Sequence, residues 1–137
     1  MIEFCFLLPW YIFLFVGAFD FGFYAYGLIA TSNAARVGAV YCAASSSACS
    51  TAAKKATVCT DYVVSQLSDM PNIGSTVTTC LASPLTMTVT YATSTCPDKT
   101  SCATVQVAYL TPQLIPIPGV LPGQMTITES VTMRLPD

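Results

Sequence analysis

Cysteine is the residue type with the clearest chemistry in this chain. Seven cysteines and no histidine are present. Six of the seven lie in the Ser/Thr-rich part of the sequence: Cys42, Cys49, Cys59, Cys80, Cys96 and Cys102. An even set of this kind over about a hundred residues predicts disulfides, which persist outside the cytoplasm. A metal site is the alternative, and it is disfavoured because no CxxC pair and no histidine could supply ligands.

The spacing of the cysteines ranks the possible pairs. Cys96 and Cys102 lie between two strand-like segments, so a local disulfide closing that hairpin ranks first. Cys42 and Cys49 would lie about 10 Å apart along a continuous helix, too far for a disulfide. The three serines at 45–47 interrupt the helical pattern and can bring the two together.

The remaining pair is Cys59 with Cys80, which would tie a helix to the sheet. Six cysteines allow about fifteen pairings, so this is a ranking and not a deduction. Cys5 lies inside an apolar segment, and we expect it to be a reduced thiol facing lipid or a protein core.

Two carboxylates stand in the apolar N-terminal segment. No residue from 4 to 19 is charged, and after Asp20 the apolar run resumes to residue 30. As a helix this segment reaches roughly 40 Å, more than the ~30 Å hydrocarbon core of a bilayer, so it can span a membrane. Residues 1–3 carry no positive charge, which disfavours a removable signal peptide. A carboxylate inside lipid costs about 2.5 to 3.5 kcal/mol, so Glu3 and Asp20 predict cationic partners.

The first cation after these acids is Arg36. It follows Asp20 by 16 residues, about 24 Å along a continuous helix, which excludes a pair within one chain. The partners must then come from a neighbouring chain shifted along the helix axis, or the acids are protonated or hydrated. For Glu3, a position at the membrane edge is an equal alternative.

Small residues and a proline also mark this segment. Ala18 and Gly22 stand four residues apart, which lets backbones of adjacent helices approach closely. Pro9 removes one backbone hydrogen bond and predicts a kink or a locally melted turn.

The pattern of the whole chain predicts an α+β fold. A long hydrophobic helix over residues 1–44 precedes a disulfide-braced domain over residues 45–137. In that domain a short second helix runs from Ser50 to about Leu67, with Val58, Tyr62 and Leu67 at near-helical spacing. Beyond it, alternation with a period of two predicts a small antiparallel sheet of three or four strands, with strands near 85–91, 105–109 and 125–133.

Two features do not fit this pattern simply. Glu129 falls on the apolar face of the last strand, and we expect a bulge to turn it outward. The proline-rich apolar stretch at residues 110–123 cannot be a central strand. It either packs over its own sheet or docks on a neighbouring subunit. If copies of this chain assemble in an open series, the second is favoured, because such subunits need heterologous surfaces that do not close on themselves.

Composition excludes several classes of function. Only 9% of residues are charged, and five basic residues with a net charge of -2 provide no cationic stripe for nucleic acid. The absence of histidine, of paired acids and of a glycine-rich phosphate loop disfavours an enzyme. Aromatic residues in the apolar segment suggest electron transfer as another rival, but no CxxCH haem-attachment motif occurs. We expect no cofactor.

The N-terminal 45 residues resemble those of the TadE-like family of pilin-related proteins. The matching elements are Ile2-Glu3-Phe4, Pro9, Asp20-Phe21-Gly22 and Asn33-Ala34-Ala35-Arg36-Val37-Gly38-Ala39. The resemblance implies membrane insertion, cleavage by a prepilin-type peptidase and assembly by pilus machinery into a helical filament of identical subunits on the bacterial surface. It also implies that Glu3 meets the amino terminus of a neighbour. TadE-like proteins are usually minor or initiating pilins, so a main subunit, a minor pilin and a single-pass anchor all remain open.

The sequence departs from the family in two ways. The basic leader and the cleavage-site glycine are absent, so we expect that the chain is mature or that its start was assigned differently. Six cysteines exceed what the family leads us to expect, which suggests a fibre exposed to harsh conditions.

Overall fold

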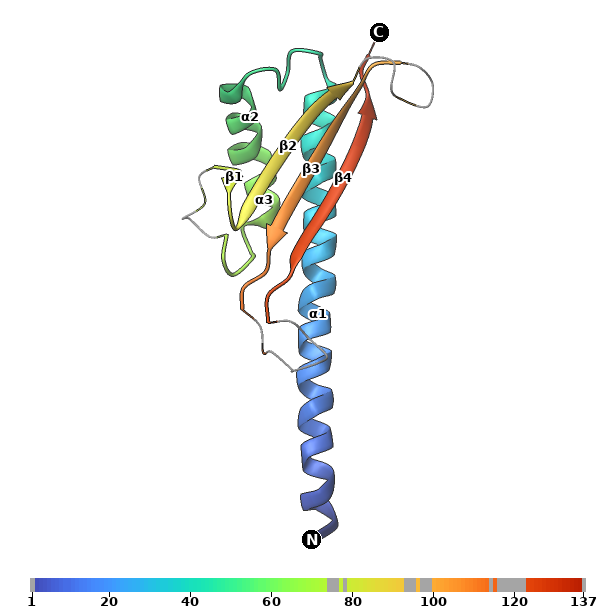
Figure 1. Cartoon of the computed structure of the whole chain (residues 1–137), viewed down its shortest axis with the longest axis vertical. Coiled ribbons are helices and arrows are strands. Elements are labelled where there is room, and N and C mark those ends of the chain that lie inside the picture. The colour runs from blue at the N-terminus through green and yellow to red at the C-terminus, as the bar shows by residue number, and fades with distance from the viewer. Residues whose placement is uncertain are drawn as a thin grey trace.

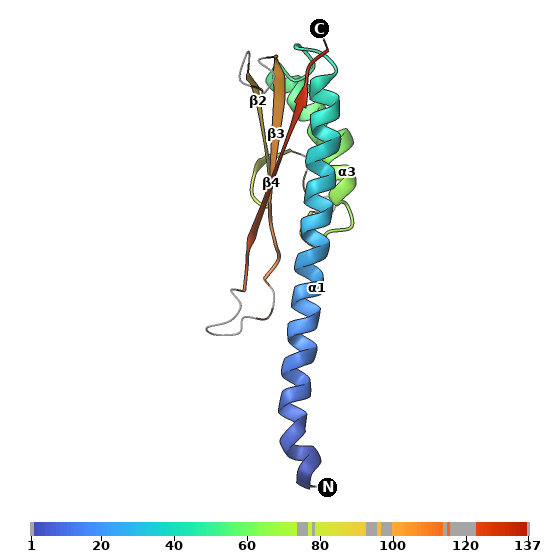
Figure 2. The same ribbon diagram turned by 90° about the vertical axis from the view of Figure 1, so that its right-hand side faces the viewer.

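The structure is a computed structural model in which a long helix carries a small domain on its C-terminal half (Figure 1). It describes residues 2–73, 77, 79–92, 96, 100–113, 115 and 123–136. The N-terminal half of the helix projects from the domain as a bare shaft in both side views (Figures 1 and 2). The predicted α+β fold is confirmed.

The long helix, α1, runs from Ile2 to Ala43 without interruption. It stays helical through Pro9, so the locally melted turn that the sequence suggested is absent there. Its end agrees with the predicted end near residue 44. The serine-rich segment then reverses the chain through turns, which begin with the bond from the Ala44 amide to the Tyr41 carbonyl at 3.2 Å.

The second helical segment contains a wider turn in its middle. It consists of α2 (Ala52–Val58), a π-helix (Cys59–Val63) and α3 (Val64–Leu67). Thr51 caps its N-terminus by accepting a hydrogen bond from the Lys54 amide at 3.4 Å.

The π turn changes which residues of this segment face the core. Val63 and Leu67 are fully buried, as expected for Leu67. Tyr62, which the helical spacing grouped with the apolar positions, is 37% exposed instead and packs its ring 4.8 Å from that of Tyr41. A π turn holds more residues than an α turn, so it rotates the residues that follow relative to an α-helical pattern.

Four antiparallel strands form one sheet in the order β1-β2-β3-β4. Their bounds are β1 Leu81–Ala82, β2 Leu85–Ala92, β3 Cys102–Leu110 and β4 Thr126–Arg134. Alternation places Val105, Val107 and Tyr109 in the core and leaves Gln106 exposed. This is the one-sided sheet that the period of two predicts.

The sheet packs along one side of the C-terminal half of α1, against which β3 and β4 both lie (Figure 2). Small residues on this side of α1 allow the close approach: Ala34, Ala35 and Ala39 are fully buried. Gly27 is the tightest point, since an added Cβ would lie 2.9 Å from the Ile127 side chain. α1 is therefore both the shaft and one wall of the core.

The predicted bulge at Glu129 is wrong. Glu129 pairs with Val107 in a register that runs unbroken from Cys102↔Arg134 to Leu110↔Thr126. Its side chain stays on the helix-facing side, half-buried, because β4 is the edge strand and that side is open to water there.

Most of the proline-rich stretch lies outside the described residues, as does Lys99. Of residues 110–123, the structure describes only 110–113, 115 and 123. Whether that stretch packs on its own sheet or on a neighbour stays a prediction.

Candidate functional site

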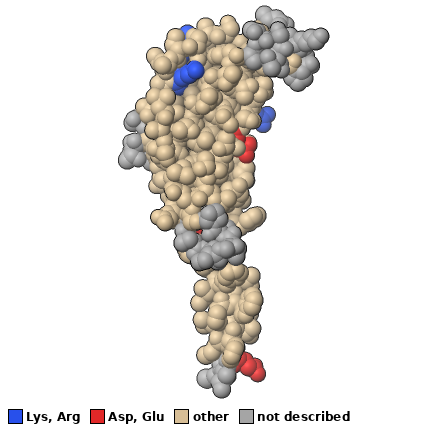
Figure 3. Space-filling view, in the orientation of Figure 1, with Lys and Arg blue, Asp and Glu red and all other residues tan. Residues whose placement is uncertain are grey.

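The shaft of α1 exposes its large apolar side chains. Phe4, Phe6 and Phe15 are 72%, 80% and 74% exposed. Every residue from 3 to 15 is exposed, so the apolar surface runs right round the helix and not along one stripe. No Lys, Arg, Asp or Glu atom is visible on the tan surface of the shaft above its tip in Figure 3. Isolated soluble proteins rarely expose a patch of this size, so this surface is a site of contact with lipid or protein.

The helix is long and apolar enough to cross a membrane. The candidate span is Glu3–Ala43, 41 residues, and its most apolar window of 18 residues has a mean hydropathy of 1.9. The aromatic side chains leave shallow grooves between them, and one of about 750 Å³ has a mostly apolar lining of Phe4, Leu8, Tyr11, Ile12, Leu14 and Phe15. A groove of this composition fits acyl chains or apolar side chains, and it offers no group for catalysis.

Asp20 stands where the shaft meets the outer domain. Its side chain is only 3% exposed, and neither carboxylate oxygen has a hydrogen-bond partner among the described residues. A buried carboxylate without a partner is costly, so such a group calls for an explanation, such as a bound water, an ion or a contact with another molecule. The sequence located this residue, but not its burial.

Glu3 and Arg36 lie at the two ends of the exposed side of α1. Glu3 is exposed in the first turn, where a negative charge interacts favourably with the helix dipole. Arg36 is exposed on the C-terminal half of the same helix, the half that lies beside the outer domain. Because α1 is unbroken, the structure does not bring Glu3, Asp20 and Arg36 together within one chain.

The two other predicted assembly residues, Pro9 and Gly22, are both exposed on the shaft. Pro9 lines a second apolar groove with Trp10 and Phe13. A Cβ added at Gly22 would meet no described atom within 4 Å, so another helix could approach its backbone there.

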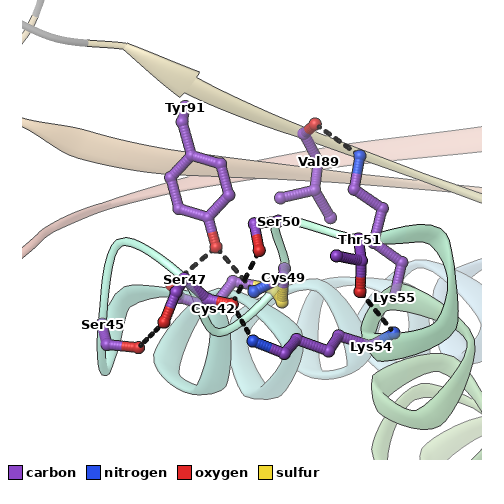
Figure 4. Close-up of a disulfide and its surroundings, with 10 residues drawn as sticks. All are labelled: Cys42, Ser45, Ser47, Cys49, Ser50, Thr51, Lys54, Lys55, Val89 and Tyr91. Atoms are coloured by element: carbon purple, nitrogen blue, oxygen red, sulfur yellow. Dashed lines mark hydrogen bonds between the residues drawn. A yellow bond between two sulfur atoms is a disulfide. The ribbon is translucent and has the colours of Figure 1, made fainter.

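At the opposite end of α1, a disulfide fixes the reversal of the chain. Cys42 and Cys49 are joined with their Cα atoms 5.2 Å apart. The Tyr91 hydroxyl of β2 reaches into this loop (Figure 4), where it accepts from the Cys49 amide at 2.9 Å and donates to the Cys42 carbonyl at 3.1 Å. One hydroxyl thereby satisfies two backbone groups next to the bridge.

Two lysines tie the second helix to the same region (Figure 4). Lys54 donates to the Ser47 carbonyl at 2.8 Å, and Lys55 donates to the Val89 carbonyl at 3.5 Å. Both ammonium groups therefore bind backbone carbonyls of neighbouring segments, and these bonds hold the second helix in place beside the end of α1.

The other bridges join Cys59 to Cys80 and Cys96 to Cys102, so all three pairs are those that the sequence ranked first. Cys5 is free and exposed. Among the described residues, no three His, Cys, Asp or Glu side chains gather where a metal ion could bind.

Tyr109 is a titratable group of the core whose pKa moves clearly. It is fully buried and its hydroxyl donates to the Asn72 side chain at 2.7 Å. Burial disfavours the phenolate and raises the pKa of Tyr109 to about 12. The phenol is therefore neutral at ordinary pH, and its role is to pack and hydrogen-bond within the core.

Sequence reasoning missed Tyr91 and Gly27. In the sequence, Tyr91 looks like an ordinary strand residue. Its hydrogen-bond partners lie 42 and 49 residues away, so no local pattern indicates them. Gly27 could have been found from its spacing, since it stands seven residues after Asp20 and so on the same side of a helix.

Comparison with known proteins finds a match that covers most of α1. Residues 1–40 match the family model described as TadE-like protein. No curated protein and no solved structure matches the chain. The matched residues include the exposed shaft, Asp20 and Arg36. The first 40 residues of this protein are therefore similar to the N-terminal segment of a TadE-like protein, which fits a pilus-related protein.

Proposed function

We propose that this chain is a pilin-like structural subunit whose α1 first anchors it in the membrane and then polymerises with other copies into an extracellular helical filament. The outer domain is carried on the filament surface. Prepilin-type peptidase and the pilus assembly machinery are the partners that this proposal requires.

The observation that carries the proposal is the division of α1 into two halves. Every residue from 3 to 15 is exposed, whereas α1 contributes to the core from Phe23 onward, with Phe23, Tyr24 and Leu28 packed against it and Ala34 fully buried. The exposed residues 3–15 are not part of that core. The shaft is thus free to exchange one apolar environment for another.

The all-round exposure of residues 3–15 argues for several neighbours at once. A single partner helix covers one stripe of about 100° or a little more, and the rest would remain in water. Lipid covers the whole circumference, and so does a bundle of copies around each helix. A membrane before assembly and a helical filament after it both meet this requirement.

A second candidate function, a single-pass membrane-anchored protein or a minor pilin of the same system, is favoured by the length of the candidate span. Mass spectrometry of sheared surface fibres separates the roles. We expect this chain to be the dominant component. Trace abundance would indicate a minor or initiating pilin, and retention in membranes alone would indicate an anchor.

Substitution at Glu3 tests the assembly role directly. In cells that build the fibre, Glu3→Ala should leave the chain inserted in the membrane but prevent fibre formation, because the carboxylate at the helix start is the predicted contact with a neighbour. Asp61→Ala, at an exposed acid of the outer domain, is the matched control and should form fibres normally. Normal fibres from Glu3→Ala would refute this role.

A further inference from the structure

Three charged residues, and only three, occur in α1: Glu3, Asp20 and Arg36. Asp20 follows Glu3 by 17 residues, and Arg36 follows Asp20 by 16 residues. Along the helix these intervals are nearly equal, about 25 and 24 Å. Parallel copies of α1 displaced by that distance would bring charges of different copies to the same level.

The middle and last of these charges both lack a protein partner among the described residues. Asp20 is buried without a hydrogen-bond partner among the described residues. Arg36 is exposed, and no acceptor within the described ranges binds it, whereas Lys54 and Lys55 each donate to a backbone carbonyl. The two residues have complementary charges, and the straight course of α1 prevents them from meeting in one copy.

We propose that Asp20 binds Arg36 of a neighbouring copy, in a filament whose adjacent parallel α1 helices are staggered by about 24 Å. This inference rests on the proposed function and names the contact that sets its axial register. A guanidinium and a carboxylate form paired, charge-assisted hydrogen bonds, which satisfy both oxygens of the carboxylate at once.

The two side chains point in nearly opposite directions from α1, so the contact adds copies in a series and does not close into a pair. Sixteen residues at 3.6 per turn place Asp20 and Arg36 about 160° apart around α1. One copy therefore receives an arginine on one side and offers its own on nearly the opposite side. A two-fold dimer needs both contacts on a single face, so this arrangement excludes it and produces a head-to-tail series.

Gly17 provides the approach to Asp20. It lies one turn toward the N-terminus, and a Cβ added there would meet no described atom within 4 Å. A guanidinium can therefore lie against the bare backbone at Gly17, one helical turn from Asp20.

The same stagger matches the apolar surfaces. It places residues 4–19 of one copy beside residues 20–35 of the next, where Phe21, Tyr26 and Ile29 are 71%, 51% and 62% exposed. It also brings Glu3 of one copy within about one residue of the level of Asp20 in its neighbour, so Arg36 of a third copy can lie near two acids. All three charges of α1 then meet in one layer.

Chemical cross-linking tests the contact. Arg36→Lys keeps the positive charge and adds an amine that a membrane-permeant carbodiimide can join to a carboxylate in contact with it. We expect an amide between Asp20 and the introduced lysine in assembled fibres, identified by mass spectrometry of the linked peptides. The two positions lie about 24 Å apart in one chain, so such a link must join two copies.

Ala44→Lys in the chain that retains Arg36 is the matched control. Ala44 is exposed and lies about 12 Å beyond Arg36 in the direction of the α1 axis. The amine of the introduced lysine should therefore not reach Asp20 of the neighbouring copy. Fibres of Arg36→Lys without the Asp20 link, or an equal yield of that link in the control, would overturn the inference while leaving the proposed function intact.

A charge exchange supplies a second, independent test. Asp20→Arg or Arg36→Asp alone should reduce the assembled fraction by about tenfold or more, because each change brings like charges together in a desolvated contact. The double variant with both changes should recover much of that loss. No recovery, with both singles still assembled as in the unmodified chain, would contradict the pairing. Failure of the unmodified chain to assemble at all would instead refute the proposed function, and the inference with it.

Discussion

The Tyr91 hydroxyl is the smallest group whose removal tests how the outer domain is held to α1. It lies between the two ends of the Cys42–Cys49 loop, accepting from the Cys49 amide and donating to the Cys42 carbonyl (Figure 4). Tyr91→Phe removes this oxygen and keeps the ring. The change therefore deletes two hydrogen bonds and leaves the disulfide and the packing in place.

The expected loss is about 2 kcal/mol of the free energy of unfolding, at about 1 kcal/mol for each bond. Both backbone groups are close to the bridge and only partly accessible to water, so neither recovers its full hydration. For a domain of this size, that loss corresponds to a fall in Tm of roughly 10 °C.

Thermal and urea unfolding of the detergent-solubilised chain, followed by near-UV circular dichroism, measure the loss. Hydrogen exchange at the Cys49 amide is the local readout, and this amide should exchange faster in Tyr91→Phe. Tyr26→Phe is the matched control, because Tyr26 is 51% exposed on α1, and we expect its effect to stay within about 0.5 kcal/mol.

The reasoning would be refuted if Tyr91→Phe unfolded at the temperature of the unmodified chain and its Cys49 amide kept its protection. A double-mutant cycle with Cys42→Ala and Cys49→Ala sharpens the test. The hydroxyl and the bridge restrain the same loop, so their effects should not add, with a coupling of about 0.5 kcal/mol or more.

Three further predictions concern the outer domain. Replacing Cys59 and Cys80 together by Ala should lower the free energy of unfolding by about 3 kcal/mol, the chain-entropy value for a bridge over 21 residues, and an unchanged urea midpoint would contradict it. Gly27→Val should destabilise the domain by about 1 to 2 kcal/mol, since its Cβ would lie 2.9 Å from a β4 methyl carbon, whereas Gly22→Val, where no described atom lies within 4 Å, should leave thermal unfolding nearly unchanged. The unfolded phenol of Tyr109 ionises near pH 10 while the folded one ionises at about 12, so stability should fall by up to about 3 kcal/mol as the pH rises from 10 to 12. Tyr109→Phe should remove that part of the pH dependence, and an identical pH profile in the two chains would argue against it.

The sequence by itself determined the elements that local chemistry dictates. Nearly thirty residues with a single carboxylate could form only a helix that needs an apolar environment, because backbone groups in lipid must bond within the segment. The alternation at residues 85–91 predicted β2, since side chains of a strand point to opposite faces in turn. The cysteine pair around residues 97–101 was readable because the two flanking strands had to form a hairpin.

Tertiary packing decided the features that depend on distant contacts. Asp20 was visible as a charge, but its burial follows from where α1 meets the outer domain. Tyr91 read as an ordinary strand residue, and its role arises because β2 passes over the end of α1. The expected bulge at Glu129 failed because an edge strand leaves its half-buried side open to water, which the local pattern does not encode. Local patterns thus fixed which elements form, while the meeting of elements far apart in the chain decided which polar groups are hydrogen-bonded and which, such as Asp20, lack a partner among the described residues.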